Sequence, residues 1–139
     1  LALDATVITN ERSITAHDFF EGMFETALNE DEIITEIKFP IPEKASYIKF
    51  PNPASRYAMV GVFMVKKPEG ISVAVTGAGE NGVFRCQEIE NVLNSNFALE
   101  ALDNIQISHD NLTSDIHASA AYRANLIKEM AKKVLQELI

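Results

Sequence analysis

An uninterrupted apolar segment from Ala58 to Val65 lies near the middle of the sequence, bounded by Arg56 and Lys66, and it sets narrow limits on the fold. The segment is far shorter than the roughly 20 apolar residues that a membrane-spanning helix needs. A continuous apolar run of this length is typical of a strand that is buried on both faces. We therefore predict a central strand from Tyr57 to Val65.

The segments around this strand favour further strands in an antiparallel sheet. Ser46 to Phe50 precedes the central strand, and Ile71 to Thr76 follows it after a turn at Pro68-Glu69-Gly70. Val83-Phe84-Arg85 comes next, after a glycine-rich loop from Gly77 to Gly82. Short connections of this kind join antiparallel neighbours, so we expect three or four antiparallel strands.

From Cys86 onward the spacing of the apolar residues becomes helical. Ile89, Val92 and Leu93 indicate one short helix, and the segment from Phe97 to Leu102 indicates a second. The clearest helix reaches the C-terminus, where apolar residues recur four apart at Tyr122, Leu126, Met130, Val134 and Leu138. The predicted fold class is therefore α+β, with an antiparallel sheet of three or four strands followed by a cluster of about three helices.

The N-terminal third has its own pattern of short elements. Alternating residues predict a strand over the segment from Leu1 to Thr9, and a second, half-buried strand over the segment from Ile33 to Phe39. Between them, Thr15 with Asp18 three residues later indicates the start of a short helix.

The stretch from Pro40 to Ala45 holds two prolines and two charged residues, which makes it the most convincing linker in the sequence. Proline cannot donate a hydrogen bond to a sheet, so a strand is expected to end here. We place a domain boundary at this point and divide the chain into residues 1–42 and residues 43–139. Because the sequence begins at Leu1 without an initiator methionine, we also expect a piece of a longer protein.

Charge and cysteine content restrict the partners and the compartment. Twenty acidic and twelve basic residues give a net charge of −8, which repels nucleic-acid phosphates and anionic lipid surfaces. We therefore expect no nucleic-acid partner and no membrane-spanning segment. The single cysteine, Cys86, cannot form an internal disulfide, which favours a soluble protein in the reducing cytoplasm with Cys86 as a buried structural thiol.

Few residues fall into the patterns of known catalytic or metal sites. His17, His109 and His117 lie in separate segments without metal-ligand spacing, so no metal site is expected. The serine-nucleophile and nucleotide-binding loop motifs are absent. Gly77 and Gly79 after a strand permit either a plain turn or a loop that cradles an anion.

The most unusual stretch runs from Ile48 to Tyr57, and it places Lys49, Arg56 and Tyr57 around a proline-stiffened turn before the apolar strand. A lysine can hydrogen-bond a polar ligand atom, and a tyrosine offers an aromatic face for stacking against a flat ring. Alternatively, Tyr57 packs in the core with its hydroxyl at the rim, and the two cations are solvated. The sequence pattern leaves both interpretations open.

Five segments carry a resemblance to a known family, one of them Thr76-Gly77-Ala78-Gly79, which is similar to a later stretch of that family. The segment from Lys49 to Val62, KFPNPASRYAMVGV, is similar to the stretch that opens the C-terminal domain of the medium, FAD-binding subunit of molybdenum hydroxylases, the carbon monoxide dehydrogenase and xanthine dehydrogenase family. The segments from Asp18 to Leu28 and from Asp31 to Ile37 resemble the end of that subunit's central domain. The segment from Ala118 to Arg123 resembles a later stretch.

This resemblance implies a part in electron transfer. In that family, electrons pass from a molybdenum cofactor through iron–sulfur clusters to FAD, which hands them to an external acceptor. It implies FAD as the cofactor, and a molybdenum-binding large subunit and an iron–sulfur small subunit as partners. Residues 1–42 would then be the tail strands of the central FAD-binding domain, and residues 43–139 the C-terminal flavoprotein domain, an α+β sandwich.

The family's glycine-rich loops for the flavin phosphates precede the region that corresponds to Leu1. We therefore expect this chain alone to form only part of a flavin site and to be inactive by itself. A second hypothesis remains open, in which the chain is a non-enzymatic assembly module that binds partner subunits without contacting flavin.

The resemblance also implies roles for three residues. Tyr57 matches a tyrosine that covers one face of the isoalloxazine ring, Lys49 matches a lysine beside the flavin, and Ile34 matches an aliphatic residue packed near the ring. An aromatic face and an apolar neighbour exclude water from the ring, and a nearby cation favours a reduced anionic flavin. No side chain of the chain is expected to act as acid, base or nucleophile.

Overall fold

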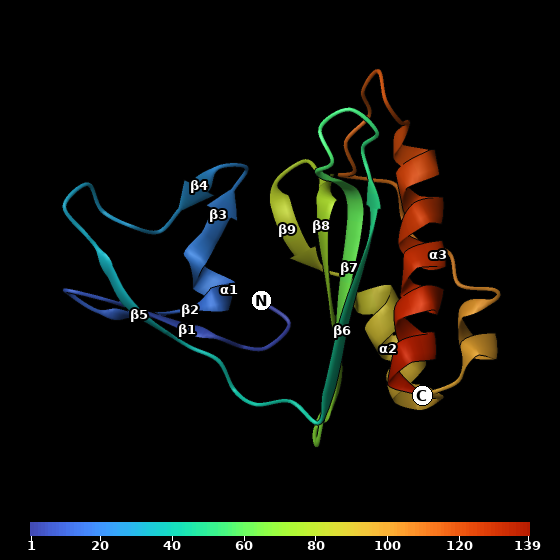
Figure 1. Cartoon of the computed structure of the whole chain (residues 1–139), viewed down its shortest axis with the longest axis horizontal. Helices are drawn as coiled ribbons and strands as arrows, with labels where there is room; N and C mark the ends of the chain where they lie inside the picture. Colours follow the sequence, from blue (N-terminus) through green and yellow to red (C-terminus); the bar gives the residue numbers. More distant parts are fainter.

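The structure, a computed structural model, describes residues 1–139 and consists of two lobes joined by residues 39–43 (Figure 1). Both lobes contain antiparallel sheets, and the helices of the larger, C-terminal lobe follow its strands in the chain. The predicted α+β class is confirmed.

A four-stranded antiparallel meander forms the C-terminal lobe, in the order β6-β7-β8-β9. Its strands are β6 (Lys44–Pro51), β7 (Ala58–Lys67), β8 (Gly70–Gly79) and β9 (Gly82–Arg85). The predicted central strand is β7, which begins one residue later than expected and ends two residues further on. Val60, Val62 and Met64 of β7 are completely buried, as the continuous apolar run indicated.

Helices cover one face of this sheet. The C-terminal helix α3 (Ala120–Leu138) packs on β7 and β6, and α2 (Gln87–Ser95) packs on β8 (Figure 1). The apolar residues four apart on α3 enter a core of 22 buried residues, except Tyr122, which is exposed. The second predicted short helix is only a single 3₁₀ turn, η1 (Leu99–Leu102). No helix combines the length and the apolar character needed to cross a membrane.

The predicted glycine-rich loop is shorter than expected. Gly77 and Gly79 belong to β8, and only Glu80 and Asn81 separate that strand from β9. Gly77 has a φ of +79°, and a Cβ atom there would lie 2.2 Å from the carbonyl oxygen of Ala58. Glycine at this position therefore permits a close approach between β8 and the start of β7, rather than a loop around an anion.

The N-terminal lobe is built from short strands and one helical turn. A three-stranded sheet has the order β2-β1-β5, and β3 pairs with β4 in a separate ribbon. Its elements are β1 (Thr6–Thr9), β2 (Ser13–Thr15), α1 (Ala16–Phe19), β3 (Phe20–Gly22), β4 (Glu25–Thr26) and β5 (Ile34–Lys38). The strand predicted from Leu1 is right only from Thr6 onward, because Asp4 ends a tight turn with a φ of +53°. The helix start was predicted correctly, since Thr15 caps α1 by accepting a hydrogen bond from the Asp18 N–H.

The second strand of this lobe, β5, was predicted as half-buried, and this is wrong. All of its residues are exposed, and of the alternating apolar residues, Ile37 in the strand is 46% exposed, while Ile33 and Phe39, which flank the strand, are 67% and 61% exposed. Only Val7, Ile14 and Phe19 form a buried cluster in the lobe. An apolar strand face becomes buried only when another layer packs on it, and these 139 residues place no layer there.

A buried carboxylate, that of Glu32, joins two separate segments of the N-terminal lobe. Glu32 accepts hydrogen bonds from the Arg12 guanidinium at 2.9 and 3.0 Å, from the Thr9 hydroxyl at 2.7 Å and from the Asn29 N–H at 3.0 Å. These donors, Arg12 first, lower the pKa of Glu32 to about 2. The carboxylate thus stays charged while it holds the turn after β1 against the segment that leads into β5.

Candidate functional site

The turn between β6 and β7 is fixed by hydrogen bonds among its own residues. The Asn52 carboxamide oxygen accepts from the N–H groups of Ala54 at 2.9 Å and Ser55 at 3.3 Å. The Ser55 hydroxyl accepts from the Tyr57 N–H at 3.3 Å, and the Asn52 N–H donates to the Tyr57 carbonyl at 2.7 Å. This network gives an exposed turn a defined shape.

Lys49 braces the same turn from β6. Its Nζ donates to the carbonyl of Arg56 at 3.1 Å, and Arg56 has a left-handed backbone with a φ of +64°. Such a conformation costs a non-glycine residue on the order of 1 kcal/mol, so the surrounding contacts must hold it. The lysine is therefore part of the turn that carries Tyr57, and it is exposed to solvent.

Tyr57 lies at the end of the turn and is 80% exposed. The interpretation in which this tyrosine packs in the core with its hydroxyl at the rim is therefore wrong. Its hydroxyl has no hydrogen-bond partner in the protein, and its ring is free to contact a flat ligand.

On β6, Lys49 lies in one row with Gly61 of β7 and Thr76 of β8. The strand register pairs Lys49 with Gly61, and Gly61 with Thr76. Because the neighbouring positions Val62 and Val75 are in the core under the helices, the row lies on the opposite face of the sheet. A Cβ atom on Gly61 would lie 2.4 Å from the Tyr47 hydroxyl, so the tyrosine side chain occupies the space that the glycine leaves.

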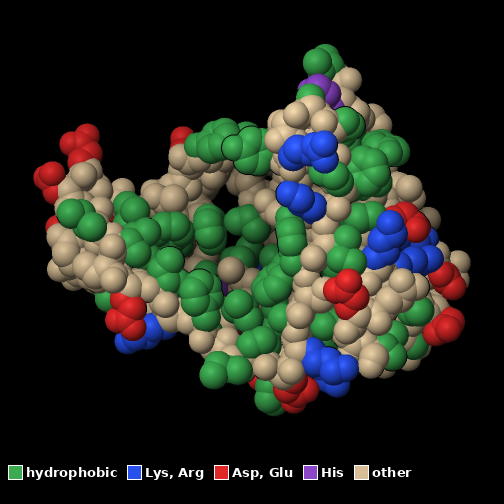
Figure 2. Space-filling view, in the orientation of Figure 1, with side chains coloured by type: hydrophobic (Ala, Val, Ile, Leu, Met, Phe, Trp, Pro, Cys, Tyr) green, Lys and Arg blue, Asp and Glu red, His purple; other side chains and the backbone are tan.

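This face of the sheet looks toward the N-terminal lobe (Figure 1). Figure 2 shows the molecule hollowed between the two lobes, with hydrophobic side chains gathered around the opening. A pocket of about 180 Å³ lies between the lobes, and its lining includes Ala2 and Phe20 on one side and Phe63 and Thr76 on the other. The hollow thus has mostly apolar walls, and of the row only Thr76 lines the pocket.

The three residues that the resemblance singled out fall into two groups. Lys49 contacts the residue beside Tyr57, so these two belong to one turn. Ile34 lies in the other lobe, on β5, where it pairs with Thr9 and is 39% exposed. The sequence reasoning did not single out Tyr47, although the two-residue spacing of Tyr47 and Lys49 on a strand is a signal that they share a face.

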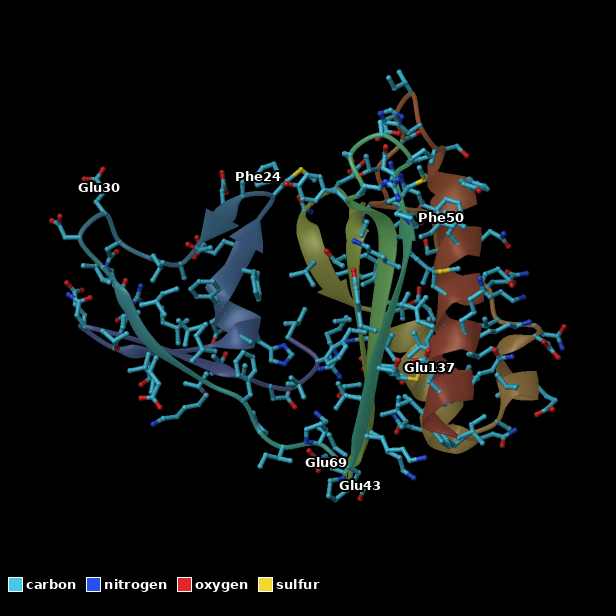
Figure 3. The ribbon with its side chains drawn as sticks, viewed as in Figure 1. Phe24, Glu30, Glu43, Phe50, Glu69 and Glu137 are labelled. Carbon is cyan, nitrogen blue, oxygen red and sulfur yellow. The ribbon has the colours of Figure 1, made fainter.

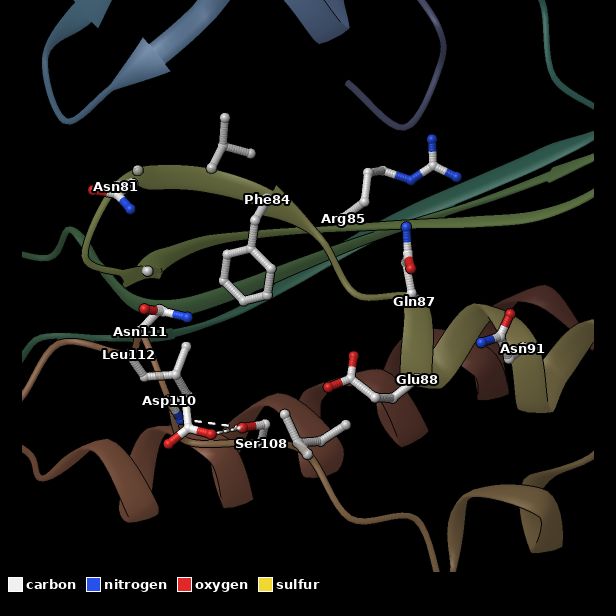
Figure 4. A pocket seen from close by; sticks show the side chains of 14 residues that line it. Asn81, Phe84, Arg85, Gln87, Glu88, Asn91, Ser108, Asp110, Asn111 and Leu112 are labelled. Carbon is white, nitrogen blue, oxygen red and sulfur yellow. Dashed lines mark hydrogen bonds between the residues drawn. The ribbon is translucent and has the colours of Figure 1, made fainter.

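A second pocket, of about 660 Å³, lies elsewhere (Figure 4). It is bounded by β9, the start of α2 and residues 107–112, and polar side chains such as Asn81, Gln87 and Asp110 line it. The Ser108 hydroxyl donates a hydrogen bond to Asp110 at 3.0 Å. None of Ile34, Lys49 and Tyr57 reaches this pocket, so it is separate from the turn.

Cys86 directly precedes α2 and is completely buried. Burial raises the pKa of its thiol to about 12. Only the thiolate is a nucleophile, so this cysteine is inert at neutral pH, and the prediction of a structural thiol is confirmed. No group of three or more His, Cys, Asp and Glu side chains is arranged to hold a metal ion.

The amino-acid sequence of the chain is similar to a known family and to several known proteins. Residues 1–42 match the family model described as FAD binding domain in molybdopterin dehydrogenase. The glyceraldehyde dehydrogenase medium chain of Sulfolobus acidocaldarius is 32% identical over 99% of this chain and 54% of its own length. The nicotine 6-hydroxylase medium subunit of Paenarthrobacter nicotinovorans is 31% identical over 99% of this chain and 53% of its own length. The chain thus spans about half the length of the curated relatives it matches.

A third relative and a solved structure agree with these matches. The 6-hydroxypseudooxynicotine dehydrogenase complex subunit alpha of Paenarthrobacter nicotinovorans is 27% identical over 100% of this chain and 52% of its own length. Quinoline 2-oxidoreductase from Pseudomonas putida superimposes with a TM-score of 0.74 at 22% identity, over 98% of this chain and 52% of that chain, so the fold is shared. The relatives are named as subunits of larger enzymes. The family match and the named relatives thus support assignment of the chain to the FAD-binding medium subunits of molybdenum hydroxylases, the carbon monoxide dehydrogenase and xanthine dehydrogenase family.

Proposed function

We propose that the chain is part of the FAD-binding subunit of a molybdenum-containing hydroxylase or dehydrogenase, and that it supplies the ring side of the flavin site. The observation that carries this proposal is the fully formed turn that holds Tyr57 outward, braced by Lys49, on the lobe that forms one wall of an apolar hollow. A core aromatic residue would be buried, whereas a residue that stacks on a bound ring must be accessible before the ring arrives.

The side chains fit a flavin ring chemically. When bound, FAD supplies electron transfer between the iron–sulfur clusters and an external acceptor. Tyr57 covers one ring face and excludes water from it, and Ile34 contributes an apolar contact from the other lobe. Lys49 places a positive charge beside the ring, where it offsets negative charge on the polar ring atoms. Gly61, between Lys49 and Thr76 in the row, leaves room for the Tyr47 side chain, so Tyr47 covers this part of the sheet face.

The proposal extends to organisation and partners. Residues 1–42 form the end of the central FAD-binding domain and residues 43–139 the C-terminal domain; the end of the family match at residue 42 and the separate sheets of the two lobes support this division. A molybdenum-binding large subunit and an iron–sulfur small subunit are the proposed partners, since the relatives are named as subunits. The buried, reduced Cys86 supports the cytoplasm as the compartment.

A flavin titration tests the proposal. The chain by itself, and the product of the complete reading frame that contains it, are titrated with FAD while flavin fluorescence and absorbance are followed. Saturable binding by the longer product, with weaker or no binding by the chain alone, is the expected result, because the family's phosphate-binding loops lie outside the matched region. Binding by neither would contradict the proposal and favour the assembly module.

Substitution of Tyr57 makes the test specific to the ring site. Tyr57→Ala in the longer product should weaken flavin retention by roughly tenfold, because it removes an aromatic stacking contact worth about 1–1.5 kcal/mol. Tyr57→Phe keeps the ring and is the matched control, so it should retain flavin nearly as the parent does. Equal retention in all three proteins would show that Tyr57 does not cover the ring.

A further inference from the structure

One charged residue lies on the buried side of α3 and has no role in the site described above. Arg123 is 4% exposed and precedes Ile127 and Met130 by four and seven residues, which places it on the apolar stripe of the helix. Burial of a guanidinium is costly unless its donors are paired. A buried arginine at this position therefore needs hydrogen-bond acceptors that pair with its guanidinium.

The partners of Arg123 come from three separate segments. Nη1 donates to the carbonyl of Met59 at 2.7 Å and to the carbonyl of Gly77 at 3.0 Å. Nη2 donates to the Asp115 carboxylate at 2.8 Å, whereas Nε is buried without a partner. One guanidinium thus ties together the start of β7, the end of β8 and the segment before α3.

Asp115 extends this arrangement toward the surface. Its second carboxylate oxygen accepts from the N–H groups of His117 at 2.9 Å and Ala118 at 3.0 Å. These two N–H groups, together with Arg123, hold the pKa of Asp115 below its ordinary value, so the pair is charged at neutral pH. We call Arg123, Asp115 and the carbonyls of Met59 and Gly77 the arginine clamp.

The arginine clamp acts on the strand just after Tyr57. Met59 is two residues beyond Tyr57, and Gly77 also packs against the carbonyl of Ala58. The residues before Tyr57 are held by their own turn and by Lys49. Tyr57 is therefore the exposed residue between two fixed segments, one held from β6 and one held from α3.

We propose that Arg123 is a positioning residue, which fixes the direction in which Tyr57 projects from the start of β7. That the ligand of Tyr57 is a flavin rests on the proposed function. That Arg123 fixes the position of Tyr57 does not depend on it. Lysine cannot replace arginine here, because a single ammonium cannot reproduce a planar fork that reaches two carbonyls and a carboxylate at once.

The first experiment uses the 139-residue chain without any ligand. The sequence has no tryptophan and three tyrosines, so Tyr47→Phe and Tyr122→Phe leave Tyr57 as the sole fluorescent reporter. Arg123→Lys in this background should lower the fluorescence anisotropy of Tyr57 by increasing its local motion. Val134→Ala, a completely buried position further along α3, is the control for loss of stability.

The comparison separates positioning from stability. All proteins are measured well below their unfolding midpoints, and Val134→Ala should leave the anisotropy at the parent value. An unchanged anisotropy in Arg123→Lys, or an equal decrease in both variants, would overturn the proposal. Where Arg123→Lys does not fold, Asp115→Asn weakens the same clamp from its more exposed side and should lower the anisotropy in its place.

The second experiment uses the FAD-loaded product of the complete reading frame. Arg123→Lys should release flavin up to roughly tenfold faster, the effect expected of Tyr57→Ala, because a misdirected Tyr57 loses its stacking contact with the ring. If the parent retains flavin and Tyr57→Ala releases it faster while Arg123→Lys equals the parent, the positioning role is wrong and the proposed function stands. If the parent binds no flavin, the proposed function fails, and the anisotropy result alone decides whether Arg123 positions Tyr57.

Discussion

Two charged residues of this chain, Glu32 and Arg123, are buried, and each is paired with an opposite charge. Glu32 joins the segments of the N-terminal lobe through Arg12, and Arg123 joins three segments of the C-terminal lobe. Removal of one partner from such a pair leaves an uncompensated buried charge, which is why each residue is a sensitive point of its lobe.

The carboxylate of Glu32 makes the stability of the N-terminal lobe dependent on pH. Its pKa is about 2 in the folded chain against an ordinary 4.5, so in acid the unfolded chain binds a proton before the folded chain does. The stabilisation is complete above about pH 4.5 and is lost as the pH falls toward 2. Amide exchange at Val7 measured from pH 7 to pH 2 should show this loss once intrinsic exchange rates are removed.

A variant provides the control for this pH dependence. Glu32→Gln should be less stable than the parent at pH 7 and should lack the decline between pH 4.5 and pH 2. If the parent and Glu32→Gln lost protection with the same pH profile, another acidic group would be responsible.

At the scale of single residues, the sequence singled out the exposed turn that carries Tyr57 but not Arg123, which holds the strand that follows it. Lys49 and Tyr57 could be named because they lie in a distinctive segment. Arg123 carried one signal, a charge on an apolar helical stripe, but its partners at Met59 and Gly77 are backbone carbonyls. Every residue has a backbone carbonyl, so the amino-acid sequence does not reveal which carbonyls will accept hydrogen bonds from Arg123 in the fold.

Among the elements, β7 is the strand on which the C-terminal lobe depends most. Val62 is completely buried, and Val62→Asp would place a charge in the core without a partner. The cost of several kcal/mol is comparable with the stability of an ordinary domain, about 5–15 kcal/mol. Circular dichroism should show no cooperative unfolding for this variant, whereas Ile116→Asp, at a position that is 95% exposed, should fold as the parent does. A folded, cooperative Val62→Asp protein would contradict the burial of β7.

The close approach of β8 to β7 at Gly77 leads us to predict that a side chain at this position destabilises the fold. Gly77→Ala forces a side chain into a left-handed conformation, with its Cβ atom against the carbonyl of Ala58. We expect a loss of about 1–3 kcal/mol in the free energy of unfolding, measured by urea titration. Gly22→Ala is the comparison, because its Cβ atom would meet only the flexible side chain of Glu25, at 3.1 Å. Equal midpoints for Gly77→Ala and the parent would show that the two strands are free to separate here.

Elements whose pattern is complete within themselves were predicted well. The apolar run of β7 and the four-residue spacing of α3 are properties of those segments alone, and both are present close to their expected bounds. The burial of β5 was predicted wrongly because burial depends on a second layer, and the alternation of residues in a strand does not say whether that layer exists.

For the molecule as a whole, the two lobes differ in how much core they contain. The C-terminal lobe has a cluster of 22 buried residues, and the N-terminal lobe has one of 3. Eight of the thirteen large hydrophobic residues that are exposed lie between Phe20 and Ile41, including the fully exposed Phe24 at the turn between β3 and β4 (Figure 3). The smaller lobe therefore keeps most of its apolar surface in contact with solvent.

This asymmetry predicts unequal local stability. In native-state hydrogen exchange, the amides of β1 and β5 should exchange at least about tenfold faster than those of β7 and β8, because opening the smaller lobe exposes little buried surface. The residues of α3 in contact with β7 serve as the internal reference. Equal protection in both lobes would mean that they unfold as a single cooperative unit.

The bond between Lys49 and the Arg56 carbonyl uses only one of the three N–H groups of an ammonium. The other two N–H groups remain available to donate hydrogen bonds to a negatively charged group that binds beside the turn. Lys49 can therefore donate to an electron-rich group of a ligand without breaking its hydrogen bond to the Arg56 carbonyl. In the flavin site that we propose, Lys49 would thus keep the turn rigid before the cofactor binds and respond to the charge of the cofactor afterwards.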